Sequence, residues 1–381
     1  MPNKENTSIT IITNFCPPYR VKLFEQLSRL YNAEFLFQGK GKRKETKYLH
    51  SIRKSNFIFV SKFGLIKRLF LSKSKVIIKA DIGKIELFIA LLLSKVLRKR
   101  FIVWNSIWYY PQTFRYRILS PILIFILKYL TDATVVYGKH GENFLIKKGV
   151  NPKKIFVAWQ TVDNKLYGRL ISHKEQEFLK KKLNLKADKI VLYVGRFEET
   201  KGLPYLLEAL KYLKKDGINF TFLCVGDGNL KRSIEEFCSK NGLDLILTDF
   251  IKTEDLPLYY KISSLLVLPS ITTKTSKETW GLAVNEAMNQ GIPVIVTDAV
   301  GAGVGGLVQN GTNGLVVPEK DILALYKGLW RLLSNEPERI RMGQNAKQII
   351  SGWTYERMAK GFVEAINYAL DKKIDEDSSD T

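Results

Sequence analysis

Histidine and cysteine are scarce in this 381-residue chain, which has three of each. Cys16, Cys224 and Cys238 are odd in number and lack the spacing of a zinc site. This argues against a disulfide framework and against a structural zinc centre, and it indicates a reducing compartment.

Long apolar runs are also missing. No stretch approaches the ~18 uninterrupted apolar residues of a membrane-spanning helix. The nearest are 118–127, which Ser120 and Pro121 interrupt, and 87–93. Residues 1–10 lack the apolar core of a signal peptide. We therefore expect a cytoplasmic protein that is soluble or attached peripherally to the inner face of the plasma membrane.

Acidic residues are rare in the first half only. The whole chain has 60 Lys and Arg against 37 Asp and Glu, a net charge of +23. Residues 1–160 hold 30 basic and 8 acidic residues, whereas residues 161–381 hold 30 and 29. The halves are thus expected to meet different partners, and the candidates for the first half are nucleic acid, an anionic membrane or an acidic ligand.

The remaining composition is that of a globular protein. Apolar residues make up 45% of the chain and charged residues 25%, which excludes global disorder. The length suffices for two or three domains.

Short apolar runs alternate with helical periodicity, most regularly in the second half. This alternation predicts parallel sheets covered by helices on both faces. We expect an α/β protein of two Rossmann-like, doubly wound domains that face a central cleft. The strands expected from the sequence are 8–13, 33–37, 75–79, 101–104, 133–136, 154–158, 189–194, 219–225, 243–247, 264–268 and 293–297.

Two glycine turns follow expected strands of the second half. The segment 195–202 (GRFEETKG) opens a helix, and Gly226 begins a second turn at the same sheet edge. Glycine permits a tight turn, and the following helix offers free N–H groups. Arg196 and Lys201 add two positive charges suited to a diphosphate. A solvated strand-to-helix turn would account for either feature alone.

A pair of carboxylates surrounds the start of another helix. Glu278 precedes the helix over 282–290 and Glu286 lies within it, about two turns later. The N–H groups near Gly281 and Leu282 are suited to phosphate oxygens, and carboxylates are suited to sugar hydroxyls. A solvated glutamate pair at a helix start is the alternative.

These blocks together resemble glycosyltransferase family 4, the retaining enzymes with the GT-B fold. The matching segments are VGRFEETKGLPYLLEAL, VGDGNLKRSIEEF, KTEDLPLYYKISSLLVLPS, ETWGLAVNEAMNQGIPVI and NGTNGLVVP. Glu278 and Glu286 match the family's E-x7-E motif. The resemblance is close over about 150–318, loose before residue 150, and typical of a cell-surface polysaccharide or glycolipid glycosyltransferase.

The resemblance implies roles for these residues. Arg196 and Lys201 would hold the donor diphosphate and stabilise the leaving group. Glu278 would contact the donor sugar near the reacting carbon, and Glu286 would bind the ribose. The expected catalytic residues are thus Glu278, Arg196 and Lys201, and the expected donor-binding residues are Gly195, Gly226, Gly281, Leu282 and Glu286.

The resemblance further implies a hexosyltransferase that uses a UDP- or GDP-linked sugar without a cofactor or metal. Residues 1–165 would form the basic, membrane-facing acceptor domain, and 166–353 the donor domain. The segment 354–381 would pack back on the first. A glycine-rich loop and a histidine that the family often has are missing here, where the chain reads NFCPPYR (14–20) and WNSIWYY (104–110). The expected acceptor-side residues are Tyr19, Arg20, Asn105 and His140.

A basic, amphipathic segment lies over 61–74 (SKFGLIKRLFLSKS). Phe63, Ile66 and Phe70 share one helical stripe, with Lys and Arg beside it. Such a helix suits an anionic bilayer, although a helix that covers the sheet would show the same pattern.

The expected partners are a nucleotide sugar, a lipid-linked or saccharide acceptor, and an anionic membrane. Two alternatives to a glycosyltransferase stay open: a nucleic-acid-binding protein, and a GT-B nucleotide-sugar epimerase. The chain has no RNA- or DNA-binding motif, so we expect no nucleic-acid partner.

Overall fold

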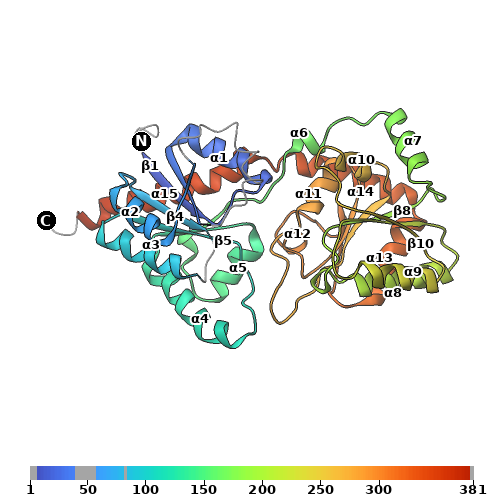
Figure 1. Cartoon of the computed structure of the whole chain (residues 1–381), viewed down its shortest axis with the longest axis horizontal. Helices are drawn as coiled ribbons and strands as arrows, with labels where there is room; N and C mark the ends of the chain where they lie inside the picture. The colour runs from blue at the N-terminus through green and yellow to red at the C-terminus, as the bar shows by residue number, and fades with distance from the viewer. Residues whose placement is uncertain (1–6, 39–56, 81–83, 378–381) are drawn as a thin grey trace. The chain divides into compact units, whose positions relative to one another are not determined.

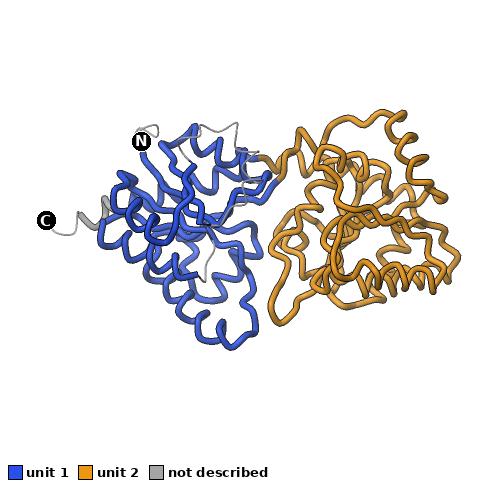
Figure 2. The backbone as a smooth tube through the Cα atoms, viewed as in Figure 1, with its two compact units in different colours: residues 1–161, 355–381 blue, residues 162–354 orange. Residues whose placement is uncertain are grey.

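The computed structural model describes residues 7–38, 57–80 and 84–377, and the chain divides into two compact units. Unit 1 comprises residues 1–161 and 355–381, and unit 2 comprises residues 162–354 (Figure 2). The division falls four residues before the boundary expected from the sequence. The helix α6 (Asn164–Tyr167) belongs to unit 2 because the Asn164 amide donates hydrogen bonds of 3.0 Å to the carbonyls of Ile350 and Trp353.

Unit 1 is built on a seven-stranded parallel sheet in the order β3-β2-β1-β4-β5-β6-β7. Its strands are β1 (Ser8–Thr13), β2 (Asn32–Phe37), β3 (Phe57–Phe59), β4 (Val76–Ala80), β5 (Arg100–Asn105), β6 (Ala133–Val136) and β7 (Ile155–Val157). The helices are α1 (Pro18–Leu30), α2 (Lys62–Leu71), α3 (Ile85–Val96), α4 (Phe114–Phe125) with its π-helical continuation η4 (Ile126–Leu130), α5 (Lys139–Lys147), the 3₁₀ turn η5 (Pro152–Lys154) and α15 (Tyr355–Asp377).

Helices cover both faces of this sheet (Figure 1). On one face, α2, α3, α4 and α5 contribute to one apolar core through Leu65, Leu87, Leu123 and Leu145. On the other face, α15 packs beside α1 and across β5, β6 and β7. In the described part of the chain, no helix is long and apolar enough to cross a membrane.

Unit 2 is built on a six-stranded parallel sheet in the order β10-β9-β8-β11-β12-β13. Its strands are β8 (Ile190–Val194), β9 (Thr221–Val225), β10 (Asp244–Thr248), β11 (Leu265–Leu268), β12 (Val294–Thr297) and β13 (Gly314–Val317). After α6 come the helices α7 (His173–Lys182), η6 (Glu199–Lys201), α8 (Leu203–Lys215), α9 (Lys231–Lys240), α10 (Leu256–Lys261), α11 (Leu282–Asn289), α12 (Gly301–Val304), α13 (Ile322–Ser334) and α14 (Glu336–Ser351).

The prediction of two doubly wound α/β domains is confirmed, and each strand predicted from the sequence is present within two residues of its expected ends. The sequence did not predict β3 and β13. Both are short edge strands, of three and four residues, and β13 begins directly after a turn that is rich in Gly and Asn. Such segments carry little periodicity, so the pattern does not distinguish them from loops.

Candidate functional site

The candidate site lies where the strand order of unit 2 reverses. From β8 the chain proceeds to β9 and β10 on one side of the sheet, and it then crosses to β11, β12 and β13 on the other. β8 and β11 are neighbours, and the chain leaves them toward opposite sides of the sheet, which is where sheets of this kind bind ligands at the carboxyl ends of their strands. Lys201 follows β8 and Glu278 follows β11, so the topology itself brings their segments together.

Lys201 and Glu278 form an ion pair at this point. The ammonium group contacts Oε2 of Glu278, and the two side chains are only 15% and 17% exposed. Ser270, directly beyond β11, donates a second hydrogen bond of 3.3 Å from its hydroxyl to the same carboxylate oxygen. Two of the three predicted catalytic residues are thus in direct contact, in a place largely shielded from water.

Close backbone contacts fix the loops around this pair. Gly202 has φ of +66°, and a Cβ atom there would lie 1.9 Å from the carbonyl oxygen of Pro269. Gly226 has φ of +142°, and its Cβ atom would lie 2.0 Å from the carbonyl oxygen of Gly195. Because only glycine fits either position, the loops after β8, β9 and β11 can pack backbone against backbone.

Arg196 is placed differently from Lys201. Its guanidinium group forms an ion pair of 2.7 Å with Glu198, and its side chain is 71% exposed. Its backbone carbonyl accepts a 2.7 Å hydrogen bond from the Tyr193 hydroxyl, which anchors the main chain. An exposed ion pair contributes little free energy, so the guanidinium group can exchange Glu198 for an anionic ligand at small cost.

Glu286 lies on α11, and its carboxylate is held by phenol groups. Tyr260 of α10 donates a 2.6 Å hydrogen bond to Oε2. Burial raises the pKa of Glu286 above its ordinary value of 4.5, and the hydrogen bonds from Tyr260 and Tyr167 oppose this shift. The sequence analysis missed both tyrosines, although a polar phenol within the buried LPLYYK helix was a usable signal.

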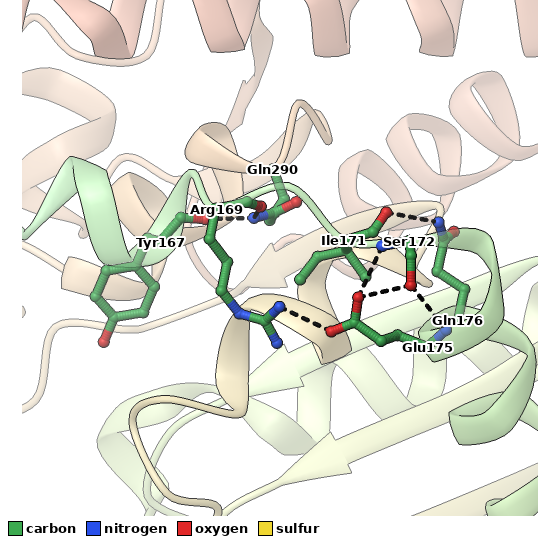
Figure 3. Close-up of polar contacts among 7 residues, drawn as sticks. All are labelled: Tyr167, Arg169, Ile171, Ser172, Glu175, Gln176 and Gln290. Atoms are coloured by element: carbon green, nitrogen blue, oxygen red, sulfur yellow. Dashed lines mark hydrogen bonds and ion pairs between the residues drawn. The ribbon is translucent and has the colours of Figure 1, made fainter.

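The position of Tyr167 is fixed by the segment that connects α6 with α7 (Figure 3). Gln290, at the end of α11, donates from its amide to the carbonyl oxygens of Tyr167 and Arg169. Arg169 in turn pairs with Glu175 at 2.8 Å, and Glu175 accepts hydrogen bonds from the backbone and hydroxyl of Ser172. These contacts tie the Tyr167 segment to the helix that carries Glu286.

The start of α11 is open to an anion. Gly281 has φ of +91° and provides no side-chain cap, so the N–H groups of the first turn near Leu282 are not satisfied by a capping side chain. The positive end of the helix dipole adds to their attraction for phosphate oxygens. Among the described residues, no group of three or more His, Cys, Asp and Glu side chains is arranged to hold a metal ion.

The acceptor-side residues predicted in unit 1 lie near the carboxyl ends of its strands. Arg20 is buried and donates a 2.7 Å hydrogen bond to the Tyr137 hydroxyl, while its Cζ atom lies 4.5 Å from the centre of the Trp104 ring. The carbonyl oxygen of Tyr19 accepts a 2.7 Å hydrogen bond from the Tyr355 hydroxyl. Arg20 thus stabilises the end of the sheet, whatever it contacts in a complex.

The other two acceptor-side residues are also buried. The Asn105 amide donates to the carbonyl of Ile107 at 3.0 Å and accepts from the Ile107 N–H at 2.9 Å. The imidazole of His140 packs edge-on against Trp108, with ring centres 5.0 Å apart. Asn105 therefore shapes the turn after β5, and His140 supports the aromatic residue beside it.

Part of the chain is similar to proteins of a known family. Residues 175–349 match the family model of glycosyl transferases group 1. The alpha-D-kanosaminyltransferase of Streptomyces kanamyceticus is 32% identical over 170 residues, which are 44% of this chain and 42% of that protein. The amylovoran biosynthesis glycosyltransferase AmsK of Erwinia amylovora is 30% identical over 151 residues, which are 39% and 37% of the two chains.

In these matches the chain spans about half the length of the curated relatives. A similar solved structure is that of HepE from Anabaena in complex with UDP, which has a TM-score of 0.79 and 17% identity and covers 95% of this chain and 99% of that one. This likeness concerns the fold. Residues 175–349 are therefore similar to the glycosyl transferases group 1 family, and the chain has the GT-B fold.

Proposed function

We propose that the protein is a retaining glycosyltransferase of family 4, which transfers a sugar from a nucleotide-sugar donor to a lipid-linked or polysaccharide acceptor at the cytosolic face of a membrane. The observation that carries the proposal is the shielded Lys201–Glu278 pair at the switch point of unit 2, within the segment that matches the family. In a sugar diphosphate, the phosphate oxygens bind a cation and the sugar hydroxyls bind a carboxylate, so the two groups of this pair suit both parts of the donor.

Donor binding would separate this pair. The diphosphate would take the Lys201 ammonium group, and the released Glu278 carboxylate would accept a hydrogen bond from a hydroxyl of the sugar. Arg196 would exchange its exposed partner Glu198 for the diphosphate, and the N–H groups at Leu282 would bind further oxygens. Glu286 retains acceptor capacity for a ribose hydroxyl, because a carboxylate offers about four lone pairs and two tyrosines use only part of them.

The chemical step follows from these contacts. The bond between the anomeric carbon and the diphosphate oxygen breaks, and the acceptor hydroxyl oxygen forms its bond to that carbon on the same face. The hydroxyl proton passes to the departing diphosphate. Lys201 and Arg196 would stabilise the negative charge that develops on the diphosphate, a contribution of about 3–4 kcal/mol for a well-placed donor.

The identity of the donor is part of the proposal. HepE was crystallised with UDP and with UDP-glucose, which supports a uridine diphosphate sugar, with a guanosine diphosphate sugar as the alternative. The name of AmsK supports an acceptor in polysaccharide biosynthesis. We further propose that the reaction needs no metal and no cofactor, so a chelator should leave the transfer rate unchanged, and a rate restored only by added metal would contradict this.

The test begins with thermal unfolding of the full chain in the presence of single nucleotide sugars. A donor at 100 times its Kd stabilises the protein by about 2.7 kcal/mol. Transfer with the stabilising sugar is then followed by NMR, which also reports the anomeric configuration of the product. Lys201→Ala and Glu278→Ala should each abolish transfer while the chain stays folded.

Lys211→Ala is a matched control, because Lys211 forms a partly buried ion pair with Glu208 on α8, away from the loops after β8 and β11. Its transfer rate should equal that of the wild type. Full activity in either site variant would refute the site assignment. Interconversion of the donor sugar without an acceptor would instead support an epimerase.

A further inference from the structure

Three helices of unit 1 present their outer sides on the same face of the sheet. Leu65 of α2, Leu87 of α3 and Leu123 of α4 belong to one core cluster, so these helices cover one face together (Figure 1). The side chains opposite these leucines therefore point to solvent on that face. We define the outer sides of α2, α3 and α4–η4 as the helical face of unit 1.

An apolar stripe runs along the outer side of α4–η4. It consists of five side chains that are between 44% and 79% exposed: Phe114, Ile118, Ile122, Phe125 and Tyr129. Their spacing of four, four, three and four residues keeps them on one side of the helix, over about 22 Å. A surface helix of a globular protein ordinarily shows polar residues there, so this stripe is unusual.

The neighbouring helices extend the apolar surface. On α3, Ile85, Leu92 and Val96 are each more than half exposed and lie seven and four residues apart, on one side. On α2, Phe63 and Phe70 are exposed, whereas Leu65 and Leu69 lie in the core. The stripe predicted from the sequence for α2 is thus present, but it is the shortest part of a larger surface.

The charges of the three helical segments are almost all positive. The segments 62–73, 84–98 and 113–130 contain ten basic residues and one acidic residue, Glu86. Between Glu86 and Asp132 the sequence has no acidic residue. Arg117, in the first turn of α4, lines a cavity of about 460 Å³ together with Phe114 and Tyr116. Positive groups therefore accompany the apolar stripe.

We propose that this helical face docks on an anionic lipid bilayer and that the α4–η4 stripe, rather than α2, is the part that enters the acyl region. Aliphatic and aromatic side chains beside Lys and Arg match the boundary between acyl chains and anionic headgroups. A second copy of the chain fits poorly, because a two-fold contact would oppose ten basic residues with ten. Nucleic acid would neutralise the charge but would leave the apolar stripe in water.

Docking on a bilayer would bring the protein to the membrane where the proposed sugar transfer takes place, and in this respect the proposal rests on that function. Its experiment is independent of sugar transfer. The cysteines Cys16, Cys224 and Cys238 are all buried, so Ile122→Cys gives a single exposed thiol for a polarity-sensitive dye. With vesicles of phosphatidylcholine and phosphatidylglycerol, the emission should shift to the blue and be quenched by brominated acyl chains.

The matched control is Leu323→Cys, which lies at an exposed apolar position on α13 of unit 2. Its dye should show neither change. Dye on Phe63→Cys reports α2 and should be quenched less than dye on Ile122→Cys. The assignment of α4–η4 would be overturned if the emission of the dye on Ile122→Cys were the same with and without vesicles. Stronger quenching of the dye at position 63 than at position 122 would also overturn it.

A second set of variants measures affinity by vesicle flotation. The triple variant Ile118→Ser, Ile122→Ser and Phe125→Ser should bind anionic vesicles about 100-fold more weakly than the wild type, since each side chain loses part of its transfer free energy. The control triple Leu323→Ser, Trp330→Ser and Ile340→Ser removes similarly exposed apolar groups from unit 2 and should bind as the wild type does. Wild-type binding should weaken with salt and be absent for pure phosphatidylcholine.

The outcomes separate docking from catalysis. If the wild type does not bind vesicles but is stabilised by a nucleotide sugar, membrane docking is refuted and the proposed sugar transfer stands. If it binds vesicles through α4–η4 but binds no nucleotide sugar, docking is supported and the proposed sugar transfer is refuted. A wild type that dimerises in solution, with a monomeric Ser triple variant and no vesicle binding, would assign the helical face to a second copy.

Discussion

The ion pair between Lys201 and Glu278 allows stability and catalysis to be separated in one set of variants. Lys201→Met removes the cation and leaves the carboxylate largely shielded, and Glu278→Gln does the converse. The double variant removes both charges and retains the approximate side-chain volumes. We expect both single variants to be less stable than the double variant, and all three to lose transfer.

The magnitude follows from the burial of the pair. Removing one partner of a fully buried ion pair costs about 3–5 kcal/mol. Because these side chains keep 15% and 17% of their exposure, part of that cost is screened, and we expect about 2 kcal/mol for each single variant. The double variant should lie within about 1 kcal/mol of the wild type, which gives a coupling free energy of about 3 kcal/mol. A loss of 2 kcal/mol corresponds to roughly 4–8 °C in Tm for a unit of this size.

The assay is scanning calorimetry of the four proteins without donor, followed by transfer assays of the same samples. Lys211→Met is the control for the loss of a partly exposed ion pair, and it should shift the transition of unit 2 by less than half as much. Additive single-variant effects would show that Lys201 and Glu278 do not interact in the folded chain. Transfer activity in the double variant would show that the charges are not needed for the reaction.

Three further predictions concern unit 2. Gly202→Ala should lower the unfolding free energy by at least about 3 kcal/mol, because its Cβ atom would lie 1.9 Å from a carbonyl oxygen. The control Gly217→Ala also has a positive φ, +75°, but its Cβ atom would meet no other atom, so it should cost only about 1 kcal/mol in the same urea titration. Tyr260→Phe should raise the pKa of Glu286 further, because it removes a hydrogen bond that favours the carboxylate. In the wild type, this group makes the unfolding free energy fall as pH rises from 4.5 through the raised pKa, and in the variant the fall should extend to higher pH. An unchanged pH profile would contradict this. The hydrogen bonds from Arg169 and Ser172 lower the pKa of Glu175 to about 2, so wild-type stability should drop as pH falls from 4.5 to about 2, and Glu175→Gln should lack that part of the drop in acid titrations.

The sheets were predictable from sequence because buried parallel strands are continuous apolar runs. Short apolar runs such as KIVLYV and TFLCV predict buried strands. Their alternation with helical segments along the chain predicts the doubly wound class. The short edge strands carry too few residues for such a pattern. The return of α15 to unit 1 was expected only through the family resemblance, since nothing in its periodicity tells which sheet it covers.

The candidate site was predictable where backbone geometry dictates the residue. The glycines, Lys201 and Glu278 lie in or near turns after strands, which are visible in the sequence, but the ion pair between Lys201 and Glu278 was not predicted. The phenol of Tyr260 was visible in the LPLYYK helix, but its pairing with Glu286 was not predictable, because Tyr260 and Tyr167 come from two helices that meet α11 only in the folded unit. The apolar stripe of α4 was hidden for another reason: the run 118–127 contains both core and outward residues, and only packing separates them.

The return of α15 has a consequence for the order in which the chain folds during synthesis. Phe362 packs edge-on against Trp104 at 5.0 Å, and α15 covers β5, β6 and β7. At ~5–20 residues per second, the ribosome needs roughly 10–40 s to add the residues between 161 and 355. Throughout that time the apolar face beneath α15 is bare. Unit 2 is complete once Thr354 has been added, before any residue of α15 is made. The nascent chain should therefore complete its second unit before its first, and a ribosome stalled ahead of Tyr355 should expose a chaperone-binding surface on unit 1 alone.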